Sequence, residues 1–379
     1  MILKMVVWRV VRRLMPAIGF LACGPAEEDA GAADASALEA ISVFVPEDSV
    51  SLTHGGDDLL RVVALAADSF AVAGYPDDPL CFVALRTHES KCVPVKGGGP
   101  AEVLGIEEFS VWPPASVAIW DGQTGKLGVW SRSGRPDTTI QVMRPSLKRQ
   151  ILIGVLPDST VIVGESAAFD DMPIGVHPIV HKLFAVRGGT TQPVALSDGR
   201  ESWTSVVEGK GYRSGRNVPS FDESFDVVTR GGVLRVDARR CVLEAPQSEA
   251  RPIPADVCGT GANGFREAVL RSLDSADGPD ADTHRAKARA SDIPESYPSI
   301  AAVLASYHTD EVALRRGRTS KDVAPFWAVL RRDGSVVERL TVPGGIRLLG
   351  FSRTHFVGAR APVDSEESVQ LLFMPRASR

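Results

Sequence analysis

Short segments in which apolar and polar residues alternate recur along the chain, and glycine turns separate them. Residues 116–142 give the clearest example, SVAIWDGQTGKLGVWSRSGRPDTTIQV, with three strand patterns divided by two breaks that contain glycine. Phe326–Arg331 and Val336–Val342 face each other across Asp333 and Gly334 in the same way. Antiparallel strands that are joined by tight glycine turns and repeated at near-regular spacing predict a β-propeller.

Six copies of this pattern predict an all-β fold, a six-bladed β-propeller that covers residues 41–375 as one domain. At roughly 40–50 residues per blade, six blades fill most of the chain. The β-branched run Ile41–Val45 is expected to act as a closing strand. A seven-bladed propeller is the alternative, if residues 297–320 build a blade of their own. The six copies lie at residues 59–95, 116–142, 159–196, 223–257, a segment that ends at Val342, and 346–374.

One segment, residues 263–290, interrupts the succession of strands. Phe265, Val269 and Leu273 have helical spacing, and a charged tail without a strand pattern follows them. The segment predicts a short helical insertion between the fourth and fifth blades, with its helix over one face of the propeller.

The composition is that of a globular protein with a large core. The chain has 379 residues, of which 44% are hydrophobic and 23% are charged. Its formal net charge is −5. Because non-specific binding to nucleic acid needs a basic face, this charge argues against a nucleic-acid partner.

The first 22 residues have the pattern of a signal peptide. Basic residues between positions 4 and 13 are followed by the short apolar region Leu14–Ala22, which is far shorter than the about 20 residues needed to cross a bilayer. Ala22 places a small residue before Cys23, as a lipoprotein signal peptidase requires, so Cys23 is the predicted lipid attachment site. Residues 23–40 form an acidic run of small residues that suits a flexible tether. An ordinary signal peptide with a chance cysteine, or an N-terminal strand, is the alternative.

The residue after Cys23 bears on where the protein is retained. By resemblance to lipoproteins of Gram-negative bacteria, Gly24 in place of aspartate favours the outer membrane. The expected location is therefore the cell envelope, with the protein lipid-anchored to the outer membrane and facing the periplasm.

The other four cysteines form two pairs that are local in the sequence. Cys81 and Cys92 flank a candidate hairpin, and Cys241 and Cys258 form the second pair. In an oxidising compartment these pairs predict two disulfides, and the alternative is four buried free thiols. Neither pair has CxxC spacing, so a zinc site is not expected.

The sequence contains no recognisable catalytic motif. Residues 259–264 read GTGANG, a formal GxGxxG, but the polar segment after them lacks the strand and acidic residue of a dinucleotide site. A glycine turn that enters the insertion helix is the better interpretation. Gly97–Gly99 lacks the lysine and hydroxyl residue of a phosphate-binding loop, and it is interpreted as a turn between blades. No GxSxG nucleophile motif occurs.

Two histidines and a basic segment also invite functional hypotheses. His177 and His181 stand four apart near Asp170 and Asp171, but on a strand such residues are roughly 13 Å apart, too far to share one ion. They are therefore expected to be ordinary strand or loop histidines, and no metal or cofactor is predicted.

The basic segment contains Lys210, Arg213 and Arg216 among glycines. Anion binding is one hypothesis for it, and a solvated loop between blades is the preferred interpretation.

Four segments resemble a known family. They are GGGPAEV at 97–103, VAIWDGQTGKLGVWSRSG at 117–134, the insertion at 263–290, and FWAVLRRDGSVVERLTVP at 326–343. The chain resembles the exported six-bladed β-propeller lipoproteins of bacteria, which are distantly similar to the NHL-repeat propellers, over residues 41–375. The resemblance implies a fold and no catalytic residues, because propellers host unrelated functions.

The functional hypothesis is a lipid-anchored binding or protein-interaction module, without enzymatic activity and monomeric. Its expected partner is an envelope protein or a small ligand, because propeller loops converge around a central channel. The alternative is a hydrolase of the lactonase type that uses a metal in that channel. Such propellers use carboxylates and asparagines as ligands, and this chain has only Asn217 and Asn263. Three or more carboxylates pointing into the channel would favour the enzyme.

Overall fold

In the computed structural model, residues Glu39–Arg379 form one compact unit. The predicted signal peptide (1–22), the lipid attachment site Cys23 and the tether (23–40) lie outside the described residues. Among the residues that the structure describes, no helix is long and apolar enough to cross a membrane. The described residues are 41–52, 61–74, 79–99, 101–122, 124–142, 149–168, 171–197, 199–208, 213–217, 223–259, 261, 263–274, 286, 289, 293–317, 324–360 and 369–376.

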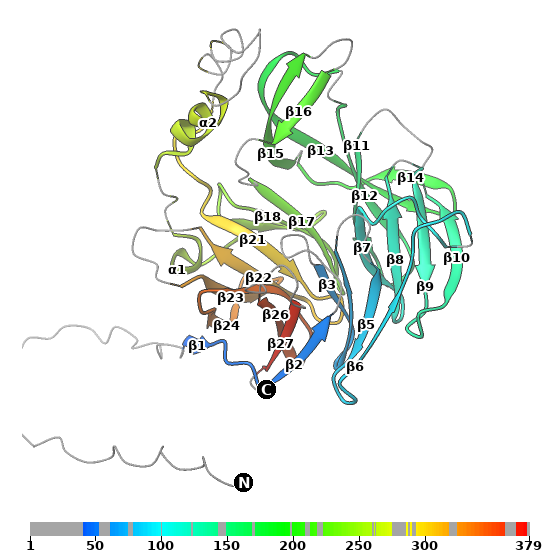
Figure 1. Cartoon of the computed structure of the whole chain (residues 1–379). Coiled ribbons are helices and arrows are strands. Elements are labelled where there is room, and N and C mark those ends of the chain that lie inside the picture. Colours follow the sequence, from blue (N-terminus) through cyan, green and yellow to red (C-terminus); the bar gives the residue numbers. More distant parts are fainter. Residues whose placement is uncertain are drawn as a thin grey trace, which may run out of the picture. The chain divides into compact units, whose positions relative to one another are not determined.

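Six sheets, one for each blade, follow one another along the chain and form a six-bladed β-propeller (Figure 1). The first blade consists of β3 (Arg61–Ala66), β4 (Ser69–Ala73), β5 (Leu80–Ala84) and β6 (Glu89–Val93). The second consists of β7 (Glu108–Trp112), β8 (Ser116–Asp121), β9 (Lys126–Trp130) and β10 (Pro136–Gln141). The third consists of β11 (Arg149–Val155), β12 (Val161–Ser166), β13 (Gly175–Arg187), β14 (Thr190–Pro193), β15 (Gly199–Glu208) and β16 (Arg213–Asn217).

The remaining blades include two strands from the start of the chain. The fourth blade consists of β17 (Ser224–Thr229), β18 (Gly232–Asp237), β19 (Val242–Glu244) and β20 (Arg251–Pro252). The helices α1 (Ala255–Cys258) and α2 (Phe265–Asp274) follow it. The fifth consists of β21 (Ile300–Ala305), β22 (Glu311–Arg316), β23 (Phe326–Arg331), β24 (Val336–Thr341) and β1 (Ile41–Val43). The sixth consists of β25 (Ile346–Phe351), β26 (His355–Arg360), β27 (Val369–Pro375) and β2 (Asp48–Leu52).

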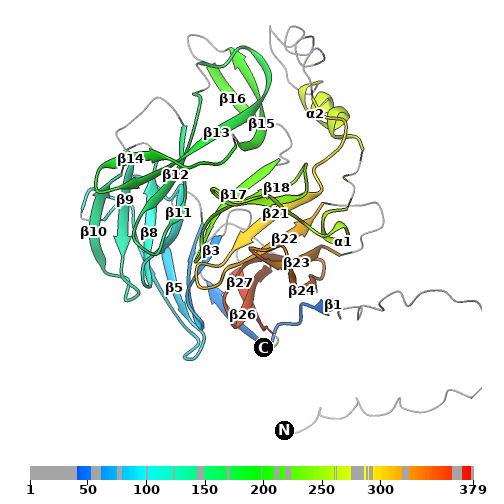
Figure 2. The ribbon, with the colours of Figure 1, turned by 180° about the vertical axis from the view of Figure 1, so that it is seen from behind.

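The first strand of each blade lies at the centre, and these six strands form a closed ring. Along the ring β3, β7, β11, β17, β21 and β25 each contact the next, and β25 contacts β3 (Figures 1 and 2). We call the end of the central channel where these strands begin the mouth. The opposite end, where each strand turns into the second strand of its blade, is the floor.

Hydrophobic clusters between neighbouring blades form the core. The strand β8 shows how the sequence produces this packing, because all four residues Val117–Trp120 are buried. Val117 and Ile119 pack toward the first blade, whereas Ala118 and Trp120 pack toward the third. Since side chains alternate between the two faces of a strand, a blade that is covered on both sides needs apolar residues on both.

The sequence predicted that Ile41–Val45 closes the propeller. This prediction is wrong, because the strand that closes it is β2. Asp48–Leu52 pairs antiparallel with β27 and completes the sixth blade. Ile41–Val43 does form a strand, but it pairs parallel with β24 at the edge of the fifth blade. Val50 and Leu52 are buried between the first and sixth blades, whereas Ile41 and Val43 remain about half exposed. Burial of the apolar face of β2 therefore decides that this strand completes the sixth blade and closes the propeller.

The predicted six blades are confirmed, and the seven-bladed alternative is wrong. Residues 297–320 were considered for an extra blade, and their strands β21 and β22 are the two inner strands of the fifth blade. The predicted copies did not include the inner strand β7 of the second blade or the inner strand β11 of the third. The sequence analysis also missed the hairpin of β15 and β16, which extends the third blade beyond β14.

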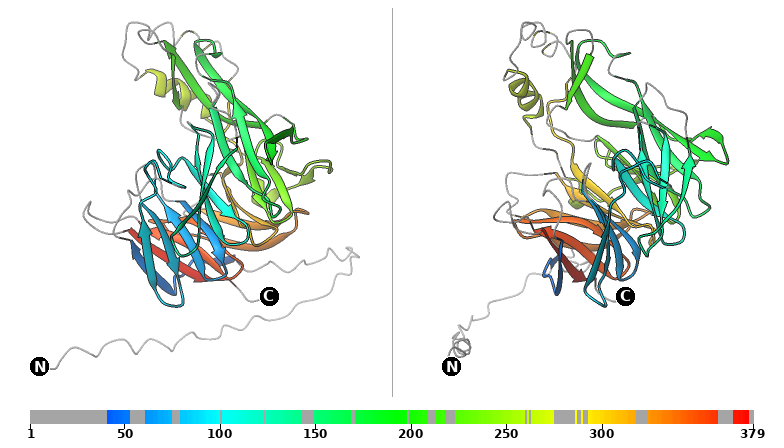
Figure 3. Two further views of the ribbon diagram at one scale, coloured as in Figure 1. Left: turned by 90° about the vertical axis from the view of Figure 1, so that its right-hand side faces the viewer. Right: turned by 45° about the vertical axis from the view of Figure 1, so that its right-hand side comes forward.

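The helical insertion between the fourth and fifth blades is confirmed, with α2 as its helix. Phe265 and Val269, two of the three residues whose spacing predicted the helix, are buried on one side of α2. They pack against Val176 of β13 and Ile293. The insertion is thus fixed to the extended third blade. Figure 3 shows α2 and the long strands β13, β15 and β16 rising on the same side of the blades.

Candidate functional site: the central cavity

A cavity of 410 Å³ lies in the central channel of the propeller. All six inner strands contribute to it, so residues from position 61 to position 349 meet at one place. Pockets of 300–1,000 Å³ are typical of small-molecule sites. The residues that line the cavity are Arg61–Ala64, Phe109–Val111, Ile153, Val227, Val228, Val303–Ala305, Tyr307 and Arg347–Leu349.

Aliphatic side chains from all six inner strands line this cavity, together with Ser110, Tyr307 and two arginines. Branched apolar residues dominate the inner strands, as in RVVALA of β3 and IAAVLA of β21. Their side chains pack alternately toward the two neighbouring blades, and the partly buried ones, such as Val63, Ile153 and Val303, also line the channel. The same sequence pattern that builds the blade interfaces therefore supplies the aliphatic part of the channel wall.

The two charged residues among those lining the cavity are arginines, and both lie at the mouth. Arg61 is the first residue of β3 and Arg347 the second residue of β25, the neighbouring inner strand. Arg61 forms an ion pair with Glu108 of β7, and its guanidinium is 3.5 Å from the carbonyl oxygen of Glu107. These contacts hold Arg61 at the rim, where the first and second blades meet.

The carboxyl of Glu107 belongs to the same rim. Its pKa is raised above the ordinary value because the group is partly buried and because Asp121 lies nearby. Arg149, at the start of β11, opposes this shift. The rim of the mouth therefore carries charges of both signs, with arginines at the start of β3, β11 and β25 and the acidic residues Glu107 and Glu108 at the start of β7.

The turn between β21 and β22 forms the floor of the cavity. Tyr307 belongs to the fifth blade but packs against the hydrophobic cluster between the first and second blades, and it lines the cavity. His308 hydrogen-bonds with the backbone of Ala64 and Leu65, also in the first blade. Because the first and fifth blades are not neighbours, the turn must reach across the channel axis. The Tyr307 ring therefore narrows the channel at this end.

The electrostatic surroundings of this turn follow from its central position. Burial raises the pKa of Tyr307 above its ordinary value; Arg230 opposes the shift and Asp158 adds to it. Those two residues stand in the corresponding turns of the fourth and third blades. Burial also lowers the pKa of His308. At neutral pH the floor is thus formed by an uncharged phenol beside an uncharged imidazole.

The additions to the third and fourth blades both lie on the side of the mouth. His181 of β13 pairs with Ser166 of β12, which in turn pairs with Arg149 at the start of β11. The preceding residues of β13 extend past that point and carry β15 and β16. Since α2 packs on this extension and leads toward the start of β21, the insertion flanks the mouth (Figure 3).

A buried charged network joins the third and fourth blades outside the cavity. The His181 Nε2 atom lies 2.5 Å from Asp226 Oδ2, and Arg235 donates to both carboxylate oxygens at 2.7 and 2.9 Å. Arg235 also donates to the backbone of Ser197. The three side chains are at most 3% exposed. We interpret this network as a connection between blades.

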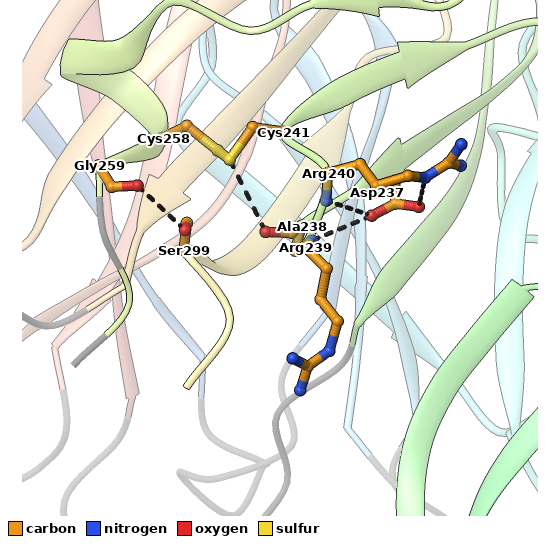
Figure 4. The surroundings of a disulfide bond; sticks show 8 residues. All are labelled: Asp237, Ala238, Arg239, Arg240, Cys241, Cys258, Gly259 and Ser299. Atoms are coloured by element: carbon orange, nitrogen blue, oxygen red, sulfur yellow. Dashed lines mark hydrogen bonds and ion pairs between the residues drawn. A yellow bond between two sulfur atoms is a disulfide. The ribbon is translucent and has the colours of Figure 1, made fainter. Parts of the chain in front are cut away.

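The two predicted disulfides are confirmed. Cys81 and Cys92 face each other across β5 and β6. The bond between Cys241 and Cys258 joins the turn after β18 to α1, where the insertion begins (Figure 4). Asp237 supports that turn, because its Oδ1 atom accepts hydrogen bonds from the backbone N–H groups of Arg239 and Arg240 (Figure 4). The second disulfide therefore holds the start of the insertion on the fourth blade.

The structure also places the other residues that the sequence analysis considered. His177 and His181 both lie in β13, a strand, as expected. Arg213 and Arg216 lie in β16, so the basic segment is partly a strand and was wrongly interpreted as a loop; Lys210 lies outside the described residues.

In the residues that the structure describes, both glycine segments lie outside helices and strands. Gly264 directly precedes α2, and a side chain at Gly261 would collide with the carbonyl oxygen of Tyr297. Gly97–Gly99 lies in the turn between the first and second blades, closed by a hydrogen bond from the Gly97 N–H to Val103. Within the described part of the chain, no three histidine, cysteine or acidic residues are grouped closely enough to hold a metal ion.

Sequence reasoning did not identify the cavity. Its lining residues look like ordinary core positions, because their strands have the same apolar pattern as the rest of each blade. An arginine that opens a central strand was the available signal, as in RVVALA and IRLLGF, since a charge at that position lies at the channel rim.

Comparisons with known proteins give structural similarity alone. No protein-family model matches the chain, and no curated protein matches it. Similar solved structures include a DUF4221-family protein from Bacteroides vulgatus, with 9% identity, a TM-score of 0.44, and coverage of 88% of this chain and 98% of that chain. A protein from Bacteroides fragilis described as exported has 12% identity, a TM-score of 0.43, and coverage of 89% and 94%. Virginiamycin B lyase from Staphylococcus aureus has 9% identity, a TM-score of 0.41, and coverage of 86% and 98%. The propeller fold is shown by this chain's own sheet topology and strand contacts.

Proposed function

We propose that this protein is a lipid-anchored, non-enzymatic binding module of the cell envelope whose recognition site is the mouth of the propeller channel. The observation that carries the proposal is the 410 Å³ cavity, to which all six blades contribute. A concave site that combines apolar side chains with a few polar groups is the usual form of a small-molecule site. Two disulfides support a location outside the cytoplasm, because such bonds persist in oxidising compartments.

The ligand part of the proposal is tested by native mass spectrometry of protein purified from its own envelope. We expect a non-covalently retained small molecule in addition to the mass of the lipidated chain. In a variant with a filled cavity, Ala305→Phe, that molecule should be lost, because Ala305 lines the cavity beside Tyr307. Retention of the same molecule by this variant would show that the cavity is not the recognition site.

A protein partner at the mouth is tested in cells. Cross-linking of the tagged, lipidated protein followed by mass spectrometry should identify one abundant envelope protein, with cross-links to the flanking α2 (Phe265–Asp274). Cross-links confined to the floor side, for example at Arg353, would contradict an interaction at the mouth.

The anchor is tested by fractionation of cells. The unaltered chain should be found in the outer membrane, and Cys23→Ala should remove the lipid attachment and its mass. Two acyl chains are needed for stable anchoring, so loss of the modified cysteine has a large effect on membrane attachment. If the intact masses of the unaltered protein and of Cys23→Ala differ only by the mass difference between cysteine and alanine, Cys23 is not lipidated.

We do not propose the metal-dependent hydrolase, since no observation favours it. That activity calls for carboxylates that point into the channel, and the described residues that line the cavity contain none. The charged groups there are the two arginines of the mouth.

A further inference from the structure

We infer that the outer edge of the fifth blade binds an extended segment of a partner protein, in which apolar residues alternate and basic residues flank them. The segment pairs with β1 as one more strand of the blade. The strand order of this blade is β1-β24-β23-β22-β21, so β1 is its outermost strand and β21 its inner one (Figures 1 and 2). The edge is therefore separate from the channel mouth and adds a second interaction site to the proposed function.

The side chains that β1 exposes are apolar. Ile41, Val43 and the following Val45 are 54%, 55% and 61% exposed. They are three of the four exposed large hydrophobic residues in the described part of the chain. Phe44 is buried between the fifth and sixth blades, so Ile41 and Val43 lie on the opposite face of the strand. The edge of the fifth blade thus presents a short apolar stripe.

Outer strands of other blades expose polar side chains instead. In the sixth blade, β2 exposes Ser49 and Ser51, and in the second blade β10 exposes Thr138 and Thr139. Polar or charged side chains on an edge strand discourage another chain from pairing with it. The segment Ile41–Val45, ISVFV, contains no charged residue. An exposed apolar edge of this kind marks a binding surface.

The backbone of β1 is also open on its outer side. The Phe44 N–H donates to the carbonyl oxygen of Thr341 in β24 at 2.8 Å. Successive residues of a strand direct their N–H and C=O groups to opposite edges, so those of Ile41 and Val43 point away from β24. Another polypeptide strand matches this alternation of donors and acceptors, and side chains at every second position of that strand would meet the apolar stripe. The occupant is therefore an extended protein segment with alternating apolar residues.

The charge of the occupant follows from the residues around β1. Glu47 follows the strand closely and is exposed. Residues 24–40, the predicted tether, contain five acidic residues and no basic one. Arg339, which is level with Ile41 in β24, forms an ion pair with Asp256. Acidic residues thus stand on both sides of the apolar stripe in the sequence, and they favour a partner with basic residues on both sides of its own.

Other occupants fit this edge less well. A second copy of the chain would bring the same acidic residues against each other, and an anionic bilayer would repel them. The preceding segment 24–40 contains no β-branched or aromatic residue, so its composition is poor for a strand that would pair with β1.

The test measures binding of the synthetic peptide KVTVTVK, with blocked ends, by fluorescence anisotropy. The protein is the chain from Gly24 onward, exported with another signal peptide so that no detergent is present; this chain retains the unit Glu39–Arg379. Two control peptides separate the contributions: KSTSTSK lacks the apolar side chains, and EVTVTVE reverses the charge. We expect each control to bind about tenfold more weakly than KVTVTVK. The difference between KVTVTVK and EVTVTVE should decrease at high salt.

Variants locate the binding on β1. Val43→Pro removes an outward N–H but keeps the pairing with β24, since proline is tolerated on an edge strand whose N–H faces solvent. It should weaken KVTVTVK binding about tenfold without a change in melting temperature. If Val43→Pro does not fold, Ile41→Ser combined with Val45→Ser removes the apolar stripe and should have a similar effect. The matched control is Ser51→Ala, an exposed position of β2, which should bind the peptide as the wild type does.

Several results would overturn the inference. Absence of KVTVTVK binding, equal binding of the three peptides, or an equal effect of Ser51→Ala would show that β1 is not such a site. A dimer in multi-angle light scattering that Val43→Pro disrupts would identify a second copy as the occupant instead. Flotation with vesicles of phosphatidylethanolamine and phosphatidylglycerol that is lost in the double serine variant would identify the bilayer instead.

Discussion

The carboxylate of Asp226 should be among the most sensitive positions of this fold. Asp226 accepts hydrogen bonds from Arg235 at 2.7 and 2.9 Å and lies 2.5 Å from His181. In Asp226→Asn the size of the side chain is kept, but the negative charge between the third and fourth blades is removed. The guanidinium of Arg235, which is 1% exposed, then remains buried without a carboxylate partner.

The expected magnitude follows from that burial. Removing one partner of a buried ion pair costs about 3–5 kcal/mol, because the other charge is left uncompensated. For the unit Glu39–Arg379, an unfolding entropy of about 2.1 cal/mol/K per residue sums to roughly 0.7 kcal/mol/K. The loss therefore corresponds to a decrease in the melting temperature of about 4–7 °C.

The assay is urea and thermal unfolding, followed by circular dichroism, of the wild type and three variants. Asp226→Asn should lower both midpoints by these amounts. The double variant Asp226→Leu with Arg235→Met should recover most of the loss, because it removes both buried charges. Asp48→Asn is the control, since Asp48 is partly exposed in β2. A loss below 1 kcal/mol in Asp226→Asn, or a double variant less stable than the single one, would refute the ion-pair reasoning.

The same network predicts a dependence on pH. Burial by itself would raise the pKa of Asp226, but the hydrogen bonds from His181 and Arg235 outweigh it and lower the pKa below the ordinary value. A lowered pKa in the folded state means that the stabilisation is fully present above the unfolded pKa of about 3.9 and is lost as the pH falls through the folded value. The difference in stability between wild type and Asp226→Asn should therefore decrease as the pH falls below about pH 4. A difference that is the same at pH 3 as at pH 5 would contradict this assignment.

Three further predictions concern contacts that stabilise the blades. Peptide mapping without reductant should recover both disulfides, and four alkylated thiols would disprove them. Gly128→Ala should cost about 1–3 kcal/mol in urea unfolding, because the new Cβ would lie 2.0 Å from the carbonyl oxygen of Ala101; Gly98→Ala, which has open space around it, is the control and should cost less than half as much. Arg376→Met should cost about 3–5 kcal/mol in the same assay, since it leaves two largely buried glutamates without their cation, and a loss below 1 kcal/mol would show that they are stable without it.

The number of blades could be read from the sequence because its signals are local. Alternation of apolar residues and the Asp333-Gly334 turn depend on neighbours within one hairpin, and the same holds for the pairing of Cys81 with Cys92. The helix α2 was predictable for the same reason, from apolar spacing within ten residues. Where the local signal was weak, the prediction failed: β7, β11 and the hairpin of β15 and β16 were missed.

The candidate site was not predictable in this way, because it depends on residues far apart in the chain. Nothing near Tyr307 in the sequence indicates that it packs against the cluster between the first and second blades and forms the floor of the channel. His181 was considered as a metal ligand with its sequence neighbour His177, whereas its partner is Asp226 in the next blade. The identity of such partners is set by the order in which blades meet around the axis.

The sequence by itself determined the class of fold, the number of blades, the place of the insertion and the two cysteine pairs. The tertiary structure decided that β2 and not β1 completes the sixth blade, and that Arg61 and Arg347 stand at the mouth of one central cavity. The physical reason is the same in each case. Strand periodicity states which residues are buried within a blade, and the closure of six blades into a ring decides which of those residues meet at its centre.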